Sequence, residues 1–488
     1  GAEGVAHLVG ANATDADYAQ YGVRHSYDAL GRRTESIDSS GNKTWYFYDS
    51  AGRLTQTVRG VANAQGVANA EGEVTETRYT AFGEIGEPIS YTGRITMDTP
   101  GSRASVASAV ATLQYVASVD SREQLTYDRR GLLASSIDAE GYLTSFGYNA
   151  FGDQVSQRVQ IDAARTLQID MTYDRRGLLR SRLADAGGLG QSAAWNYDAF
   201  GRVVTATDGR GTVTTFGYDR LGRQVTQSRT VAGRVEQQST AYDAYGRVLT
   251  QADALGRVTT YAYDDTARSV MLTTPEGVRL TTEHNAHGET VRVTDAPGQS
   301  TRYEYDRDGH LRKTIAADGA TSEQQYDVPG LLTSTIDASG RRVAYEYDAA
   351  GRMLKRIEDP SGLALMTRYA YDGQGRQVRV TDALGSLTTL AYDRVGQLVE
   401  RVVDVGGLNL KTTYAWDGRG SQLTVTEGAG TAVARTTLYA YDMLGRRVSE
   451  TIDPGAGRLN LTTTYAYDGN DNLVLRTDAS GRVARYTY

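Results

Sequence analysis

The chain has 488 residues, several times the usual length of one domain, so it is either multidomain or a repeat array without a single central core. Its 40% hydrophobic and 23% charged residues suit a folded soluble protein, and no apolar run is long enough to span a membrane. The absence of cysteine excludes disulfides and thiolate metal sites, and a net charge of −7 offers no basic surface for nucleic acid.

The N-terminal residues show no targeting signal. Gly1–Gly10 lacks the charged start and apolar core of a signal peptide, and there is no initiator Met. We expect the sequence to be a fragment of a longer protein, with lead-in strands over residues 1–26. We also expect the array to be truncated at its C-terminal end.

A Tyr-Asp pair recurs along the chain and sets the architecture. Neighbouring pairs are mostly 21 to 26 residues apart, over residues 27–58 and again over 127–488. Variants at Tyr148, His284 and Trp416 keep the register. The pairs begin at Tyr27, Tyr48, Tyr127, Tyr173, Tyr197, Tyr218, Tyr242, Tyr263, Tyr305, Tyr326, Tyr347, Tyr371, Tyr392, Tyr441 and Tyr467.

Each repeat contains two glycine turns separated by strand-like segments. The Asp of the pair starts an Asp-x-x-Gly turn, usually followed by Arg, and a second Asp-x-x-Gly turn follows about ten residues later, as at Asp208–Gly211. We expect the Asp carboxylate to accept the backbone N–H groups two and three residues on, and Gly to take the left-handed conformation in a bulged type I turn. The six or seven residues between turns alternate in polarity, which predicts strands.

The repeats therefore predict an all-β fold of tandem antiparallel hairpins that form one long coiled sheet. The pattern Tyr-x-Tyr before Asp places two rings on one strand face, and stacked repeats would align them as a stripe of cross-strand aromatic pairs. We assign a structural role to the motif residues Tyr197, Asp198, Gly201, Arg202, Tyr218, Asp219, Gly222, Tyr263, Asp264, Tyr305, Asp306, Gly309, Tyr347, Asp348, Gly351, Arg352, Tyr371, Asp372, Gly375, Tyr392, Asp393, Gly396, Tyr441, Asp442 and Gly445.

One region, residues 59–126, breaks the period. It contains an Ala/Asn/Gly-rich stretch, a degenerate repeat at Tyr79–Gly83 and an Ala/Ser/Val stretch from Ser102 to Val119. We interpret it as an irregular insertion of loops with one short helix. A lengthened hairpin is the favoured interpretation, and a plug or partner-binding element is the alternative.

The motif Tyr-Asp-x-x-Gly-Arg, followed by Asp-x-x-Gly and an aromatic-x-Tyr-Asp strand, resembles the RHS/YD repeat. More than a dozen copies in register over 27–58 and 127–488 carry the resemblance. It implies a coiled sheet that walls a hollow shell, as in bacterial Rhs toxins, the toxin-complex BC cocoon and teneurins. It also implies an enclosed C-terminal toxin and delivery by a type VI or related secretion route. The C-terminal self-cleavage motif of such proteins is not found, and Asp359-Pro360 and Asp453-Pro454 occupy ordinary turns.

Catalytic and ligand-binding chemistry finds little support in the residues. The chain has 5 His, and His284 and His287 have ligand-like spacing but occupy repeat and turn positions, so we favour a structural role over a metal site. Asp468–Asp471 lacks the spaced Glu of a calcium loop. We interpret the Arg after each turn Gly as an exposed partner of the turn Asp rather than a phosphate ligand. We expect no enzyme activity and no cofactor.

Our first hypothesis is a structural shell segment that encloses and shields a C-terminal toxin of a secreted bacterial protein. Its partners would be that toxin, the remaining shell segments and a secretion spike or adaptor, with no nucleic acid and no membrane span. The alternative is a cell-surface adhesin or carbohydrate-binding module in which exposed Tyr rings stack on sugars.

Overall fold

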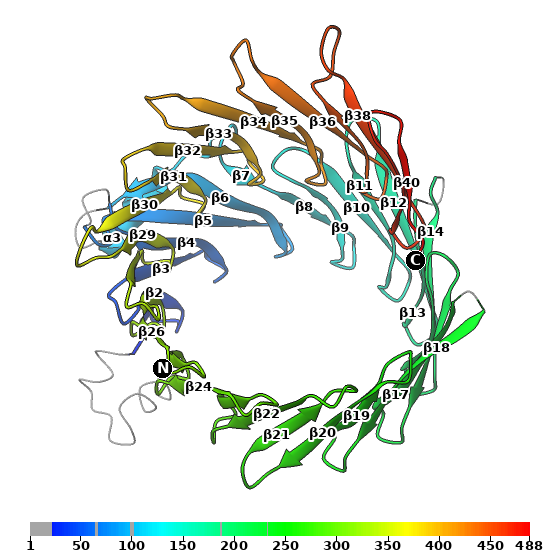
Figure 1. Cartoon of the computed structure of the whole chain (residues 1–488). Coiled ribbons are helices and arrows are strands. Elements are labelled where there is room, and N and C mark those ends of the chain that lie inside the picture. Colours follow the sequence, from blue (N-terminus) through cyan, green and yellow to red (C-terminus); the bar gives the residue numbers. More distant parts are fainter. Residues whose placement is uncertain (1–21, 64–66, 98–101, 186–187, 232) are drawn as a thin grey trace. The chain divides into compact units, whose positions relative to one another are not determined.

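The computed structural model describes residues 22–63, 67–97, 102–185, 188–231 and 233–488 (Figure 1). Of the predicted lead-in strands, residues 1–21 lie outside this described part. The chain divides into two compact units. The first unit comprises Gly1–Thr144, Tyr305–Lys313 and Ser322–Thr436, and the second comprises Ser145–Glu304, Thr314–Thr321 and Thr437–Tyr488.

The described residues form short strands and one helix, α3 (Arg103–Ala111). The first seven strands are β1 (Arg24–Tyr27), β2 (Arg33–Ile37), β3 (Lys43–Tyr48), β4 (Leu54–Val61), β5 (Glu71–Tyr79), β6 (Ile85–Thr96) and β7 (Ser121–Arg122). The next group is β8 (Gln124–Tyr127), β9 (Leu133–Ile137), β10 (Leu143–Tyr148), β11 (Gln154–Gln160), β12 (Thr166–Tyr173), β13 (Leu179–Ala184), β14 (Gln191–Tyr197), β15 (Val203–Thr207), β16 (Val213–Tyr218), β17 (Gln224–Val231), β18 (Arg234–Tyr242), β19 (Val248–Ala252) and β20 (Val258–Asp264).

The later strands continue the same alternation. They are β21 (Ser269–Thr273), β22 (Arg279–His284), β23 (Thr290–Thr294), β24 (Ser300–Tyr305), β25 (Leu311–Ile315), β26 (Thr321–Tyr326), β27 (Leu332–Ile336), β28 (Arg342–Tyr347), β29 (Met353–Glu358), β30 (Leu365–Tyr371), β31 (Gln377–Thr381), β32 (Leu387–Tyr392), β33 (Leu398–Val403), β34 (Leu410–Trp416), β35 (Gln422–Glu427), β36 (Arg435–Tyr441), β37 (Arg447–Ile452), β38 (Leu461–Tyr467), β39 (Leu473–Thr477) and β40 (Val483–Arg485).

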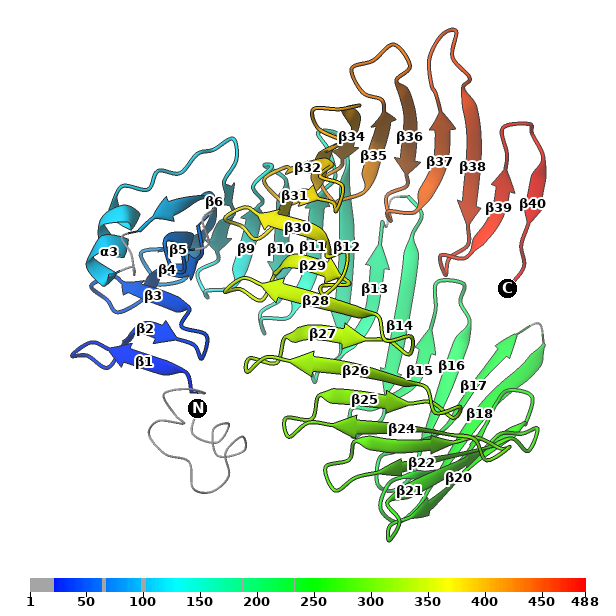
Figure 2. The ribbon, with the colours of Figure 1, turned by 60° about the vertical axis from the view of Figure 1, so that its left-hand side comes forward.

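Strands that follow one another in the sequence are neighbours in space. A seven-stranded sheet has the order β1 to β7, and the 33 strands β8 to β40 follow sequence order in a second sheet. Neighbours are antiparallel, as in the pairs β14–β15 and β28–β29. Figure 2 shows β27 to β30 stacked in this order, with their connections at alternating ends. The predicted all-β fold of tandem antiparallel hairpins is confirmed.

The Tyr of the repeat marks a β-bulge. The pairing register shifts immediately before Tyr197, Tyr218, Tyr347 and Tyr371. The bulge follows from the turn, because a type I turn closed by a left-handed Gly leaves one extra residue on one strand. The Tyr side chain therefore stands at a fixed place beside each turn.

Residues 59–126 contain more strand than we predicted. The degenerate slot at Tyr79–Gly83 is a true turn, with the Gly83 N–H donating to the Thr80 carbonyl at 3.1 Å, and it joins the long strands β5 and β6. These two strands agree with the favoured interpretation of a lengthened hairpin, and α3 (Arg103–Ala111) lies within the Ala/Ser/Val stretch, whereas loops alone do not describe residues 71–96. The polar-looking sequence of Glu71–Tyr79 hid its strand character, because its buried residues are Gly72, Glu73 and Val74, of which only Val74 has a large apolar side chain.

The well-packed hydrophobic core lies in this N-terminal sheet. It consists of buried side chains from β3 to β6, of Met97 directly after β6, and of Val106 of α3, which packs on them. Its members are Trp45, Val58, Val74, Ile89, Tyr91, Ile95, Met97 and Val106. Elsewhere most strand residues are half-buried, so the repeats depend on contacts between polar side chains. Among the described residues, no helix is both long and apolar enough to cross a bilayer.

Candidate functional site

The candidate site is the repeated turn motif, and its first part is the turn itself. The Asp198 Oδ1 accepts the Phe200 N–H at 2.9 Å and the Arg202 N–H at 3.0 Å. The Gly201 N–H donates to the Asp198 carbonyl at 3.2 Å, and Gly201 has φ +82°. The Asp carboxylate thus accepts the N–H groups two and four residues on. Our expectation of two and three is wrong, because Gly at the third position uses its N–H to close the turn.

The Arg after the turn Gly binds the Asp of its own turn. Arg202 Nε donates to Asp198 Oδ2 at 2.7 Å, and the same 2.7 Å contact joins Arg352 to Asp348 and Arg376 to Asp372. These Arg side chains are only 29%, 14% and 15% exposed, respectively. Our interpretation of this Arg as an exposed side chain is therefore wrong for these repeats. The same 2.7 Å contact recurs at Arg32, Arg53, Arg223, Arg247 and Arg446.

The same Arg also reaches the next repeat. Its guanidinium carbon lies 4.3–5.3 Å from the ring centre of the next Tyr, as for Arg247 over Tyr263 and Arg376 over Tyr392. Arg376 Nη1 donates to the carbonyl of the next Asp, Asp393, at 2.7 Å. Rings of the predicted Tyr stripe thus stack with Arg rather than forming the cross-strand aromatic pairs we expected. The stacked pairs include Arg32–Tyr48, Arg53–Tyr79, Arg202–Tyr218, Arg223–Tyr242, Arg352–Tyr371 and Arg446–Tyr467.

The Tyr hydroxyl completes the connection. Tyr371 donates to the carbonyl of Met353, the residue after the preceding turn Arg, at 2.8 Å. The Trp416 indole N–H makes the equivalent 2.8 Å bond to Leu398, so this variant preserves the function of the Tyr. The same bond is made by Tyr48, Tyr79, Tyr127, Tyr173, Tyr197, Tyr218, Tyr242, Tyr263, Tyr326, Tyr347, Tyr392 and Tyr467. We call the Asp and Arg of one turn with the Tyr of the next repeat the inter-repeat clasp.

Some predicted motif residues depart from this pattern. The turn at Asp264 has no Gly: the Asp264 Oδ1 accepts the Thr266 and Ala267 N–H groups at 2.9 Å, and Arg268 takes φ +49°. In the turn at Asp393, Gln397 takes the place of the Arg after the turn Gly, and the Gln397 backbone N–H donates to Asp393 Oδ1 at 2.7 Å. The predicted turn glycines Gly222, Gly309, Gly375, Gly396 and Gly445 all have positive φ. Tyr441 keeps its bulge opposite Arg447, and the Asp219 and Asp442 carboxylates bind Arg223 and Arg446 as the pattern requires.

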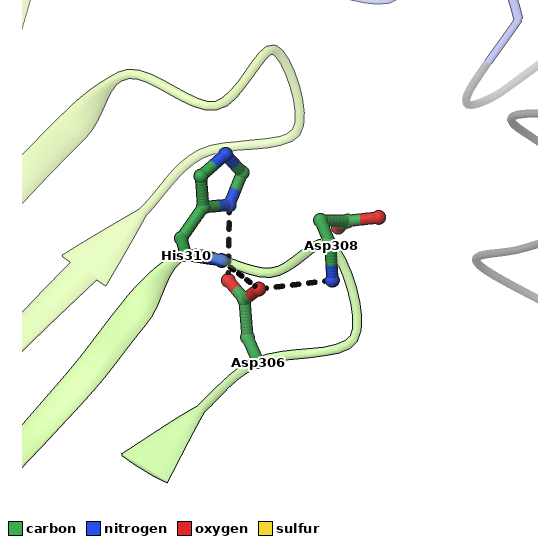
Figure 3. Close-up of side chains that lie close together, drawn as sticks. All are labelled: Asp306, Asp308 and His310. Atoms are coloured by element: carbon green, nitrogen blue, oxygen red, sulfur yellow. Dashed lines mark hydrogen bonds and ion pairs between the residues drawn. The ribbon is translucent and has the colours of Figure 1, made fainter. Parts of the chain in front are cut away.

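Three side chains in one turn come within metal-binding distance. The ligand atoms of Asp306, Asp308 and His310 lie within 4.8 Å of one another (Figure 3). His310 Nδ1 lies 3.2 Å from Asp306 Oδ2, and its ring stacks on Tyr326 with centroids 4.7 Å apart. His310 therefore occupies the place of the clasp Arg, which explains the cluster without a metal ion. For His284 and His287, for which we favoured a structural role, no group of three metal-ligand atoms includes them within the described part of the chain.

Several turn carboxyls have a pKa below the ordinary value, which favours their ionised form. Burial alone raises the pKa of Asp198, but the backbone N–H and guanidinium of Arg202 lower it by more, so its pKa lies below the ordinary 3.8. In Asp253, hydrogen bonding to the Arg257 guanidinium is the largest cause of a lowered pKa. At Asp393 burial raises the pKa instead.

These shifts predict how stability depends on pH. A carboxyl whose pKa is lower in the folded state stabilises the fold above its ordinary pKa, and this contribution is lost as pH falls through the folded-state pKa. We therefore expect the urea unfolding midpoint, followed by circular dichroism, to be constant between pH 7 and pH 5 and to fall below about pH 4. A midpoint that already falls between pH 7 and pH 5 would contradict the turn electrostatics.

The turn geometry also predicts the effect of a substitution at Gly351. This residue has φ +74°, a region that is costly for a β-branched side chain, so Gly351→Val should lower stability by about 1–3 kcal/mol. The matched control is Gly93→Val, because a Cβ at Gly93 would contact nothing within 4 Å and its backbone does not require glycine. An unchanged urea midpoint for the Gly351 variant would contradict the turn assignment.

A second set of contacts joins late turns to strands far earlier in the sequence. In the first unit, Arg352 Nη2 lies 2.6 Å from Glu73 Oε1 and 2.7 Å from Asp348 Oδ2. Both carboxylates are only 7% exposed. A cavity of about 490 Å³ lies beside this ion pair, with hydroxyl groups of Thr44 and Ser90 in its lining. The ion pair fixes the turn at Asp348 on β5.

The next turns of the first unit make similar contacts. The Gly373 N–H donates to the Thr92 carbonyl at 2.8 Å. Arg394 binds Glu140 through two nitrogens, at 2.9 and 3.0 Å. A Cβ at Gly373 would lie 2.7–2.8 Å from three backbone oxygens of residues 91–93, so only Gly fits there. These late turns therefore sit closely on the earlier strands.

The second unit repeats this arrangement with other residues. Asn470 Nδ2 donates to Asp208 Oδ2 at 2.6 Å, and Arg165 Nη1 donates to the Tyr441 carbonyl at 3.3 Å. Here too a Gly, Gly469, occupies the second turn position, where a Cβ would collide with the Gly209 carbonyl. Sequence analysis missed this contact set. In the sequence, these contacts are indicated by the Gly that replaces the more usual Ala or Arg directly after the turn Asp.

Comparison with known proteins agrees with this geometry. The family model "Teneurin YD-shell" matches residues 213–399, and the model "RHS Repeat" matches residues 27–64 and 127–160. No curated protein sequence matches the chain. These models support a structural shell role for the repeats.

Solved structures also resemble the chain. The match to the crystal structure of TcdB2-TccC3-TEV covers 94% of this chain and 30% of the TcdB2-TccC3-TEV chain, at 14% sequence identity and with a TM-score of 0.52. The match to the structure of the Photorhabdus luminescens Tc holotoxin pore covers 96% of this chain and 30% of the pore chain, at 13% sequence identity and with a TM-score of 0.39. The chain thus spans less than a third of the length of these structures, and the first of them shows the shared fold.

Proposed function

Because the chain belongs to the RHS/YD-repeat family, we propose that it is a non-enzymatic wall segment of a shell that encloses and shields a C-terminal toxin. The whole secreted protein would carry that toxin, the remaining shell segments and a contact to a delivery apparatus. The family models that match the repeats and the fold shared with TcdB2-TccC3-TEV support this proposal.

The observation that best supports this proposal is the inter-repeat clasp. Each clasp uses the carboxylate, guanidinium and hydroxyl of its motif to hold adjacent turns together, as in Asp372, Arg376 and Tyr392. A clasp of this kind stiffens a sheet but leaves no positioned nucleophile or base for catalysis. The repeats therefore suit a wall better than a reaction site.

The same observation argues against a carbohydrate-binding module. A sugar-binding Tyr needs an open ring face, whereas the ring of Tyr263 is covered by Arg247 at 4.3 Å and its hydroxyl is bonded to the Val248 carbonyl at 2.9 Å. The adhesin alternative then requires aromatic residues outside the clasp.

Limited proteolysis with mass spectrometry on the full-length gene product would test the proposal. We expect the polypeptide downstream of Tyr488 to resist protease while the array is folded and to be digested once the array is unfolded by urea. The control is the same downstream segment expressed alone, which should be digested at once. Rapid digestion of the downstream segment beside an intact array would contradict enclosure.

A further inference from the structure

The side chain that follows a turn Gly usually covers the next repeat. We call the turn after each Tyr-Asp pair, or after a variant of the pair, a YD turn. At most YD turns the residue after the Gly lies within 4 Å of the place that a Cβ would take on the Gly of the next YD turn. We call the space over that next Gly the clasp slot. Examples of filled slots are Arg202 on Gly222, His310 on Gly330, Leu331 on Gly351 and Gln397 on Gly420.

One clasp slot inside the array is empty. At Gly288 nothing lies within 4 Å of the place of a Cβ. A cavity of about 420 Å³ occupies this position, between the YD turn at Asp264 and the YD turn at Asn285. The array continues through paired strands on both sides of it, from β19 to β23. The cavity is therefore a feature of the array itself and not of either end of the sequence.

The cause lies in the turn at Asp264. Ala267 occupies the position of the turn Gly, and the left-handed residue is the following one, Arg268, with φ +49°. The two strands pair without the usual bulge, so Asp264 stands directly opposite Ser269. Arg268 thus leaves the backbone in a different direction from a clasp Arg. It makes no ion pair with any residue in the part of the chain that the structure describes.

The carboxylate of a clasp is present at the cavity. Asp264 Oδ1 accepts two N–H groups of its own turn, whereas Oδ2 has no cation partner among the described residues. In a regular clasp this second oxygen holds the guanidinium, as Asp243 Oδ2 holds Arg247 at 2.7 Å. The neighbouring Asp265 is already bound by Arg247 Nη1 at 2.5 Å. Asp264 therefore offers the acceptor that remains.

The other two groups of a clasp also line the cavity. His284 takes the position of the repeat Tyr, and its ring can stack with a planar cation. Asn285 takes the position of the next Asp. The carbonyl at that position accepts the Arg of a regular clasp, as Asp393 does from Arg376 Nη1 at 2.7 Å. The cavity thus has the carboxylate, the ring and the carbonyl of a clasp, and lacks only the guanidinium.

We propose that this cavity, the open clasp, binds the guanidinium group of an arginine side chain from another polypeptide segment. The regular clasps show in the same molecule how such a group is held, with Nε 2.7 Å from the carboxylate and the guanidinium carbon 4.3–5.3 Å from the ring centre. A side chain is the fitting ligand, since side chains fill the other slots. The site goes beyond the proposed function, because it can be occupied whether or not the array encloses a toxin.

Histidine NMR on the 488-residue chain tests the site. The chain has 5 His, so the signals of ¹³C-labelled imidazole rings can be followed one by one. Capped arginine, acetyl-arginine methylamide, should shift the His284 signal saturably with a dissociation constant on the order of 1 mM. The His310 signal should not respond, because that ring already fills its own slot. Absence of a saturable shift at His284 would overturn the proposal.

Two further probes identify the kind of ligand. Capped lysine has the same charge but cannot stack as a plane or donate two parallel hydrogen bonds, so it should bind at least about 10-fold more weakly. Equal binding of the two capped amino acids would mean unspecific charge attraction and would overturn the guanidinium site. Free arginine should bind no more tightly than capped arginine. Tighter binding of free arginine would point to a small metabolite and would overturn the assignment to a polypeptide.

Two substitutions in the turn at Asp264 test the assignment of the slot. Asp264→Asn should weaken binding of capped arginine by more than about 10-fold, and Asn149 shows that Asn can form a YD turn. Ala267→Gly restores the motif Asp-x-x-Gly-Arg, so Arg268 should fill the slot and capped arginine should no longer shift the His284 signal. Circular dichroism checks that both variants are folded. Undiminished binding by the folded Ala267→Gly variant would show that the cavity is not an open clasp.

Discussion

Arg352→Gln should lower the stability of the first unit by about 3 kcal/mol, because it leaves the buried Asp348 carboxylate without a cation and leaves Glu73 with Arg94 as its remaining cation. Glu73 and Asp348 are each only 7% exposed, and both bind Arg352 Nη2. Guanidinium-induced unfolding followed by fluorescence and circular dichroism would measure the loss. Adding Asp348→Asn to the Arg352 variant should restore part of the stability, since the uncompensated charge is removed and Asn149 shows that Asn can form this turn.

The matched control is Arg257→Gln, which breaks the same type of contact at the surface. Arg257 lies 2.7 Å from Asp253, but the two side chains are 57% and 36% exposed, so water replaces the lost partner. We expect the unfolding midpoint to change little. Equal losses in the two variants would show that the contact to Glu73 does not contribute to stability.

Gly373→Ala should weaken the packing of its turn on β6 by about 1–3 kcal/mol. The added methyl group would lie 2.7–2.8 Å from three backbone oxygens, which cannot move without disturbing the strand. Stability in a repeat array is local, so amide hydrogen exchange is the appropriate measurement. The Gly373 N–H, bonded to the Thr92 carbonyl at 2.8 Å, should exchange faster in the variant.

The reverse substitution in an uncovered turn is the control. Ala199 occupies the equivalent position in the turn at Asp198 and is exposed, which shows that the turn itself accepts alanine. Ala199→Gly should leave exchange in neighbouring turns almost unchanged. If Gly373→Ala also has no effect, the close approach of this turn to residues 91–93 is not maintained in solution.

The repeat could be predicted because its period and its turns are local. Asp198 and Gly201 specify a turn by hydrogen bonding and by φ, and both requirements are visible within five residues. The alternation between turns then sets the strands. The position of the bulge follows from the same turn chemistry.

The clasp could be predicted only in part. The Tyr was identified as a motif residue, but its hydroxyl bonds a carbonyl at least 15 residues earlier, as for Tyr392 with Gln377 and Tyr371 with Met353. Arg and Tyr of successive repeats are neighbours only after the strands pair. Treating each repeat by itself made the Arg look like a surface residue.

The long-range contacts could not be predicted at all. The partners of Arg352 and Asn470 lie 279 and 262 residues earlier, and which turns meet depends on the small twist summed over many strands. The glycine directly after the turn Asp is the local sign of such a contact. With several arrays aligned, that glycine would mark the covered turns.

The inter-repeat clasp bears on how such an array changes length during evolution. Each clasp joins only neighbouring turns, as Arg376 does with Tyr392 and Asp393, so a whole repeat could be duplicated and its new clasps would form on both sides. Insertion of a single strand would instead move every downstream turn to the opposite edge of the sheet. Glu140 and Arg394 would then face the wrong kind of turn. Insertions and deletions retained in related genes should therefore come in units of two strands.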